Sequence, residues 1–247
     1  MEFLKEALQY IRDLGVSAEH TEVMEICGRT YVNRDLVRMD KAPKARPVGT
    51  VTLSSMVDYI TSCNLEFSSD MIVHIVNPTT VCLMSVLDKE REREVLFESN
   101  AETSEFRFDQ WYDQETFMIA LQANFQPNDD LATVMRLAGN IEKKNNQTFS
   151  DDGRTQVATM TVGVASKADV IVPNPVELIP YRTFQEVAQP TSKFVFRIGD
   201  KEVPAFRLIE AEGGIWRSEA VENIKCYFQE KLENVPDELR KRITIIG

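Results

Sequence analysis

The sequence DQWYDQETFMIALQANFQPNDDLATVMRLAGNIEKK, residues 109–144, has the most regular pattern in the chain. Phe117, Leu121 and Phe125 are four residues apart, which places their side chains on one face of a helix. A short connection follows, and Asn128 is then a suitable N-cap for a second helix. The two aspartates after Asn128 match the positive end of that helix's dipole. The stretch therefore predicts two helices joined by a tight connection.

The second helix is expected to bury residues at helical spacing and to end near Asn145: Leu131, Val134, Met135, Ala138 and Ile141. Much of the remaining chain has the short, β-branched patterns of strands, as at 71–76, 79–87 and 96–99, and a hairpin pattern at 192–210. Strands and helices come in blocks, without βαβ alternation. We therefore expect an α+β fold, in which a largely antiparallel sheet packs against the central helical pair.

Additional helices are predicted near both ends of the chain. Residues 2–14 form an apolar stripe opposite charged residues, and Gly15 is expected to end this helix. The helix is expected to dock on the body, or alternatively to bind a partner or a second copy. Another helix is predicted at 50–64 with Thr52 as its cap, and a last one from Ser218. The final strand, ITIIG, is expected to pair within the sheet or with a second subunit.

The pattern divides the chain into residues 1–47 and a main α+β domain at 48–247, which holds the helical pair 109–144, a β-rich half at 153–210 and the terminal helix and strand at 217–247. Between the two parts, prolines and basic residues alternate. The candidate binding residues are Arg34, Arg38, Lys41, Lys44 and Arg46. They are interpreted as a basic arm that contacts phosphate or an acidic surface, or alternatively as a solvated linker.

The net charge of −11 disfavours general binding to nucleic acid, because an acidic chain repels phosphate backbones on average. No apolar run reaches the length of a membrane span, and the N-terminus lacks the pattern of a signal peptide. The four cysteines form no CxxC pair, so we expect small buried side chains in a reducing cytosol.

Catalytic and metal-binding motifs are not found in the sequence. It has no phosphate-binding glycine loop, no GxSxG and no HExxH. His74 shares its strand face with Ile72 and Val76, and the sequence identifies no partner that would make it a base. Asp151 and Asp152 are interpreted as turn residues rather than metal ligands. We therefore expect a non-enzymatic protein without cofactor or metal, and a paired-carboxylate hydrolase is the weakest alternative.

Residues 48–217 resemble the YfdQ-like family, a domain of unknown function carried by bacteriophages and prophages. The resemblance rests on VTLSSMVDYI at 51–60, on an aromatic segment leading into a helix, on the capped helix after Asn128, and on a proline-punctuated half from Pro173 to Phe206. It implies a phage gene product in the cytoplasm of the bacterial host. It carries over no catalytic residue, and the first 40 residues and the terminal helix lie outside it.

Three binding functions follow as hypotheses. The first is a non-enzymatic, self-associating accessory to phage infection, whose expected partners are copies of itself and a host or phage protein. The second is a counter-defence factor that captures a host immune protein or a nucleotide signal. The third is an accessory to recombination or replication that contacts single strands through the 34–46 arm and aromatic residues.

Overall fold

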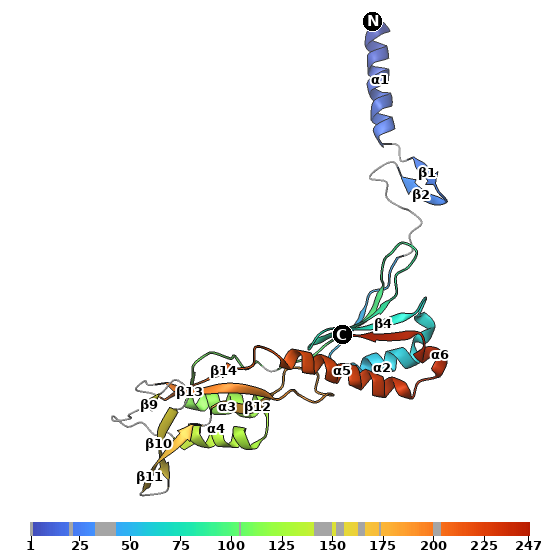
Figure 1. The fold of residues 1–247 in the computed structure, drawn as a ribbon. Helices are drawn as coiled ribbons and strands as arrows, with labels where there is room; N and C mark the ends of the chain where they lie inside the picture. Colours follow the sequence, from blue (N-terminus) through green and yellow to red (C-terminus); the bar gives the residue numbers. More distant parts are fainter. Residues whose placement is uncertain are drawn as a thin grey trace. The chain divides into compact units, whose positions relative to one another are not determined.

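The computed structural model describes residues 2–19, 22–32, 43–103, 105–140, 150–151, 156–162, 166–172, 174–199 and 204–247. The chain splits into two compact units, Met1–Lys44 and Ala45–Gly247, and Figure 1 names their elements. Each unit is described by itself below.

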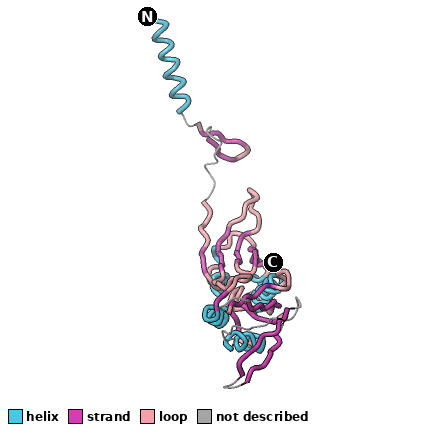
Figure 2. The backbone as a smooth tube through the Cα atoms, turned by 90° about the vertical axis from the view of Figure 1, so that its left-hand side faces the viewer, coloured by secondary structure: helices cyan, strands magenta, loops and turns pink. Residues whose placement is uncertain are grey.

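The first unit consists of helix α1 (Glu2–Glu19) and a hairpin of strands β1 (Val23–Ile26) and β2 (Arg29–Val32). The prediction that Gly15 ends the helix is wrong, because α1 continues through it as one helix (Figure 2). A glycine inside a helix costs only about 1 kcal/mol, so it does not by itself terminate one. Cys27 and Gly28 turn the hairpin, both with positive φ, as a tight two-residue β-turn requires.

The second unit contains two separate five-stranded sheets. The first sheet has the order β15-β4-β5-β6-β3. Its strands are β3 (Val48–Thr50), β4 (Met71–Asn77), β5 (Thr80–Ser85), β6 (Val95–Asn100) and β15 (Ile243–Ile246). The terminal strand β15 pairs with β4, which confirms that it joins the sheet, but this pairing is parallel, as is that of β3 with β6.

Helices α2 (Leu53–Ser62) and α5 (Trp216–Glu233) pack on one face of this first sheet (Figure 1). Short helices η1 (Asn64–Glu66) and α6 (Asp237–Arg240) complete this part. The helices contribute residues at helical spacing, among them Met56, Ile60, Ile224 and Phe228, to a core that they share with Val73 and neighbouring strand residues. All five of these side chains are fully buried.

The second sheet has the order β7-β14-β13-β12-β8. Its strands are β7 (Tyr112–Asp113), β8 (Phe125–Gln126), β12 (Val176–Pro180), β13 (Ser192–Gly199) and β14 (Ala205–Glu210). Antiparallel pairing of β13 with β14 confirms the hairpin predicted at 192–210. Strands β9 (Ser150–Asp151), β10 (Gln156–Val162) and β11 (Ser166–Val172) form a third sheet, seen as paired magenta strands in Figure 2.

The predicted helical pair is present as α3 (Gln114–Asn124) and α4 (Asp129–Asn140). It packs against the second sheet, over an aromatic core in which Phe117 stacks with Phe196 and Phe206, and α4 also contacts β10 of the third sheet. The connection between the helices is itself a strand, because Phe125 and Gln126 pair with β12. The fold is therefore α+β, as expected, but its two five-stranded sheets have separate cores where the sequence indicated one sheet.

The caps of α4 and α2 differ in where the capping side chain comes from. Asn128 Oδ1 accepts a hydrogen bond from Leu131 N at 2.8 Å, which confirms the predicted cap. Thr52 makes no side-chain cap hydrogen bond and instead contacts Ser55 Oγ at 2.6 Å. The first amides of α2 donate to Glu186, which lies far along the chain, from Leu53 N at 3.0 Å and Ser54 N at 2.8 Å. Thr52 therefore occupies the N-cap position, as predicted, but the capping side chain is that of Glu186.

Candidate functional site

Chemically reactive side chains line up on the first sheet, on the surface opposite α2 and α5, which we call the outer face. The register pairs His74 with Cys82, Cys82 with Glu98, and His74 with Ile246. Burial alternates along β4 and β5, so that their inward residues are buried and His74 and Cys82 point outward. We call Ile246, His74, Cys82 and Glu98 the cross-strand row.

The turn between β4 and β5 sets this register. Asn77 Oδ1 accepts hydrogen bonds from Thr79 N at 2.8 Å and from Thr79 Oγ1 at 2.9 Å, an Asx turn that closes the hairpin. The β-strand propensity and the turn were visible in the sequence. The partners of His74 were not, because a one-residue slip in register would place Cys82 on the other face.

The cross-strand row does not have the properties of a nucleophilic site. Burial raises the pKa of the Cys82 thiol, and the charge of Glu98 raises it further. A catalytic cysteine needs the opposite, a lowered pKa that leaves the thiolate at neutral pH. Glu98 accepts a hydrogen bond from Asn100 Nδ2 at 2.8 Å. Within the described ranges, no three His, Cys, Asp or Glu residues are grouped so that they would hold a metal ion.

The raised pKa of Cys82 has a measurable consequence. At pH 8 the rate of alkylation of Cys82 by iodoacetamide should be well below that of Cys226, which is exposed. Glu98→Gln removes the charge that raises the pKa of Cys82, so that more thiolate is present and labelling at Cys82 becomes several-fold faster. Site-resolved mass spectrometry measures both rates. An unchanged Cys82 rate in Glu98→Gln would contradict this assignment.

The exposed position of Cys27 and Cys226, and the half-buried position of Cys63 and Cys82, also correct the expectation of four buried cysteines. The residues next to each cysteine in the sequence did not indicate whether its side chain is buried. The polar face of α5 carries Cys226, and the tight turn of the β1–β2 hairpin carries Cys27.

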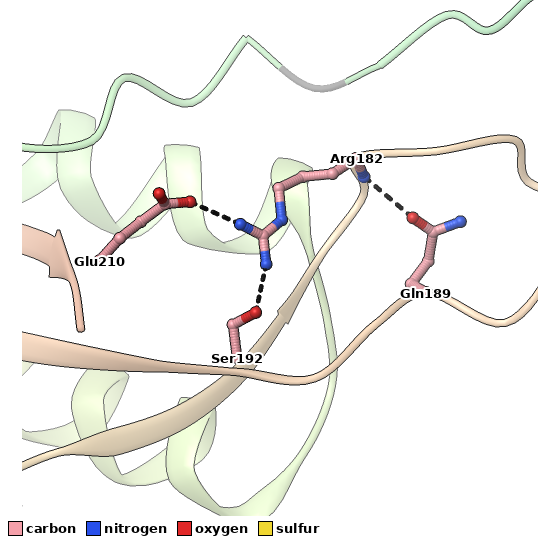
Figure 3. A network of polar contacts seen from close by, with 4 residues as sticks. All are labelled: Arg182, Gln189, Ser192 and Glu210. Carbon is pink, nitrogen blue, oxygen red and sulfur yellow. Dashed lines mark hydrogen bonds and ion pairs between the residues drawn. The ribbon is translucent and has the colours of Figure 1, made fainter. Parts of the chain in front are cut away.

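A second polar cluster surrounds Arg182, which follows β12 (Figure 3). Arg182 is only 7% exposed. Its Nη1 donates to Glu210 Oε1 at 2.6 Å and its Nη2 to Ser192 Oγ at 2.5 Å. Its backbone amide donates to Gln189 Oε1 at 2.9 Å. The guanidinium lies 4.1 Å from the centre of the Trp216 ring, at the start of α5.

Arg182 joins the two cores of the second unit. Its guanidinium also lies over Phe108 and Phe194, which belong to the aromatic core or pack against it, whereas Trp216 begins the helix of the other core. Burial lowers the pKa of Arg182 to about 10, although the charge of Glu210 opposes this. The side chain therefore stays charged at neutral pH. Its contacts are those of a structural joint rather than a ligand site.

The loop after Arg182 borders a cavity. Gln189 folds this loop by accepting from Arg182 N and Thr183 N and by donating to Phe184 O at 2.8 Å. A cavity of about 310 Å³ is lined by Val51, Thr52, Ser54, Ala101, Glu102, Phe184, Gln185 and Glu186. Both carboxylate oxygens of Glu186 accept hydrogen bonds from the first backbone amides of α2. We therefore interpret the cavity as part of the contact that fixes the start of this helix.

The basic arm predicted from the sequence is only partly described. Arg34, Arg38 and Lys41 lie outside the described residues, whereas Lys44 and Arg46 are exposed. Asp152 also lies outside them, and Asp151 belongs to β9. Among the aromatic residues, Trp111 has the Arg207 guanidinium 4.5 Å from its ring centre.

None of the protein-family models, curated proteins or solved structures with which the chain was compared matches it. Within the described part of the chain, no helix has both the length and the apolar character needed to cross a membrane.

Proposed function

We propose that this chain is a non-enzymatic, phage-encoded protein that acts by binding and self-association as an accessory to infection in the host cytoplasm. The phage setting rests on the resemblance to the YfdQ-like family. The observation that carries the binding function is the exposed apolar stripe of α1.

Helix α1 exposes large side chains along its apolar stripe. Leu8 is 61% exposed and Ile11 is 63% exposed, and the neighbouring Tyr10 is 67% exposed. Within the first unit, the β1–β2 hairpin does not pack along α1. An isolated helix of 18 residues is only marginally stable in water, and burial of apolar surface contributes about 25 cal/mol per Å². Covering this stripe would therefore stabilise the helix and the contact together.

The charges of α1 favour a protein partner over a lipid surface. Within its bounds, four acids (Glu2, Glu6, Asp13 and Glu19) outnumber two basic residues (Lys5 and Arg12). Helices that lie on anionic membranes carry a basic polar face instead. A second copy of α1 offers the same apolar stripe, so we infer that copies associate through it.

The absence of catalysis is supported by the chemistry of the cross-strand row. It is the described cluster closest in composition to a Cys/His/acid site, and the raised pKa of Cys82 works against a nucleophilic role.

The test is the solution mass of the full chain, measured by light scattering between about 5 and 100 μM. We expect a multimer for the unaltered chain and a shift to the monomer mass for Ile11→Glu, because a charge in a buried stripe is unfavourable by several kcal/mol. Gln9→Glu adds the same charge on the opposite side of α1 and should keep the multimer. A monomer at every concentration of the unaltered chain would refute self-association.

A further inference from the structure

The outer face of the first sheet mixes apolar and polar side chains that are half-buried or exposed. Besides the cross-strand row, it presents Ile72 and Val76 from β4, Thr80 and Met84 from β5, and Thr244 from β15. Val76 is 49% exposed and Ile246 is 43% exposed. The helices α2 and α5 cover the other side of the sheet, through buried residues such as Val73 and Leu83.

This face is also nearly free of charge. In the described strands of the sheet, Glu98 is the one acid among the outward residues, and His74 is the one titratable base. The whole chain carries a net charge of −11, so two copies repel each other through most of their surfaces. Depletion of charge is typical of the centre of protein interfaces. The outer face is therefore a place where two copies can meet without opposing like charges.

The order of the cross-strand row selects one symmetric arrangement. Two-fold dimers are the commonest assemblies of identical chains, and two sheets pack face to face about 10 Å apart. A two-fold axis parallel to β5, the central strand, reverses the strand order in the facing sheet. His74 on β4 then lies opposite the partner's Glu98 on β6, and Cys82 faces the partner's Cys82.

The other face-to-face arrangement brings like charges together. With the axis perpendicular to the strands, β6 faces the partner's β6, and the two Glu98 carboxylates meet. The first arrangement replaces this repulsion with two contacts in which an imidazole donates to a carboxylate. The row is therefore self-complementary in one orientation and not in the other.

We propose that the outer face is an interface between two copies of this chain, packed about a two-fold axis parallel to β5, with His74 opposite the partner's Glu98. This inference extends the self-association proposed above to a second surface, which does not involve α1.

The size of the face sets the strength of the contact. Five strands at about 4.8 Å spacing and about 20 Å of strand length give a footprint on the order of 400 Å² per copy. A standard interface buries about 800 Å² per partner, so this contact is weak by itself. Copies already held together through α1 would meet at millimolar effective concentration, at which a weak contact forms.

The test is a charge exchange read out by cross-linking at Cys82. Cys27, Cys63 and Cys226 are replaced by serine, and the full chain is treated with a bis-methanethiosulfonate that has a two-carbon spacer. We expect covalent dimers through Cys82. His74→Glu and Glu98→His should each lower the dimer yield about tenfold, which corresponds to about 1.4 kcal/mol, and the double exchange should restore it. Glu222→His, an exposed site on α5, is the matched control and should change nothing.

The same series in the Ile11→Glu background separates this inference from the α1 contact. Cross-linking that persists there at about 1 mM protein, with the same charge-exchange pattern, supports the outer face even if α1 proves monomeric. Circular dichroism confirms that each variant is folded. Absence of Cys82 dimers from folded protein, or a double exchange no better than the single changes, would overturn the proposed interface.

Discussion

Replacing Phe117 with alanine should lower the free energy of unfolding by about 3–5 kcal/mol, the largest effect expected from any single change in this chain. Phe117 is fully buried at the centre of the aromatic core. Its ring lies 5.3 Å from that of Phe206 and 5.9 Å from that of Phe196, both nearly parallel to it. Truncation removes these contacts and leaves a cavity between α3 and the second sheet.

Urea unfolding measures this loss as a lower midpoint with an unchanged slope. Ile119→Ala is the matched control, because Ile119 lies on the same helix and is 60% exposed. It should change the unfolding free energy by less than about 1 kcal/mol. Equal effects of the two substitutions would mean that the helical pair does not pack on the second sheet as described.

Arg182→Ala should lower the free energy of unfolding by about 2–4 kcal/mol. The substitution removes two charge-assisted hydrogen bonds, to Glu210 and Ser192, and the stack on Trp216. Breaking a fully buried ion pair costs about 3–5 kcal/mol. The effect here should fall near or below that range, because the Glu210 side chain is 33% exposed and stays hydrated without its partner.

Two further variants test the role of the Arg182 geometry. Arg182→Lys keeps the charge but loses the planar fork, so it should recover only part of the stability. Arg217→Ala removes a second guanidinium that stacks on Trp216, at 4.9 Å, from an exposed position, and should cost less than about 1 kcal/mol. Thermal unfolding of the three variants ranks them. A loss in Arg217→Ala as large as that in Arg182→Ala would argue against a joint centred on Arg182.

The helical pair shows why parts of this fold follow directly from the sequence. The four-residue spacing of Phe117 and Leu121 and the cap at Asn128 are local signals, and both reappear in the structure. Phe125, the third residue of the predicted stripe, lies beyond the end of α3 and belongs to β8. The end of α1 at Gly15 was wrong because one glycine is a weak signal against a favourable stripe. The basic arm remains a prediction, because Arg34, Arg38 and Lys41 lie outside the described residues.

The partners of His74 and the cap of α2 show where local reasoning stops. The sequence placed His74 on one strand face with Ile72 and Val76, yet its neighbours Cys82 and Glu98 depend on the registers of two strand pairs. Glu186 caps α2 from more than a hundred residues away, so no local pattern could replace the expected Thr52 cap by it.

The α+β class, the helical pair and the alternating faces of the strands follow from local sequence patterns, because 3.6-residue and two-residue periodicities are properties of neighbouring residues. Three features required the folded chain: the two five-stranded sheets with separate cores, the contacts by which Arg182 joins those cores, and the row shared by His74, Cys82 and Glu98. These features depend on which distant strands pair and in which register. That choice is made by the packing of whole faces, so it is fixed only when the chain folds.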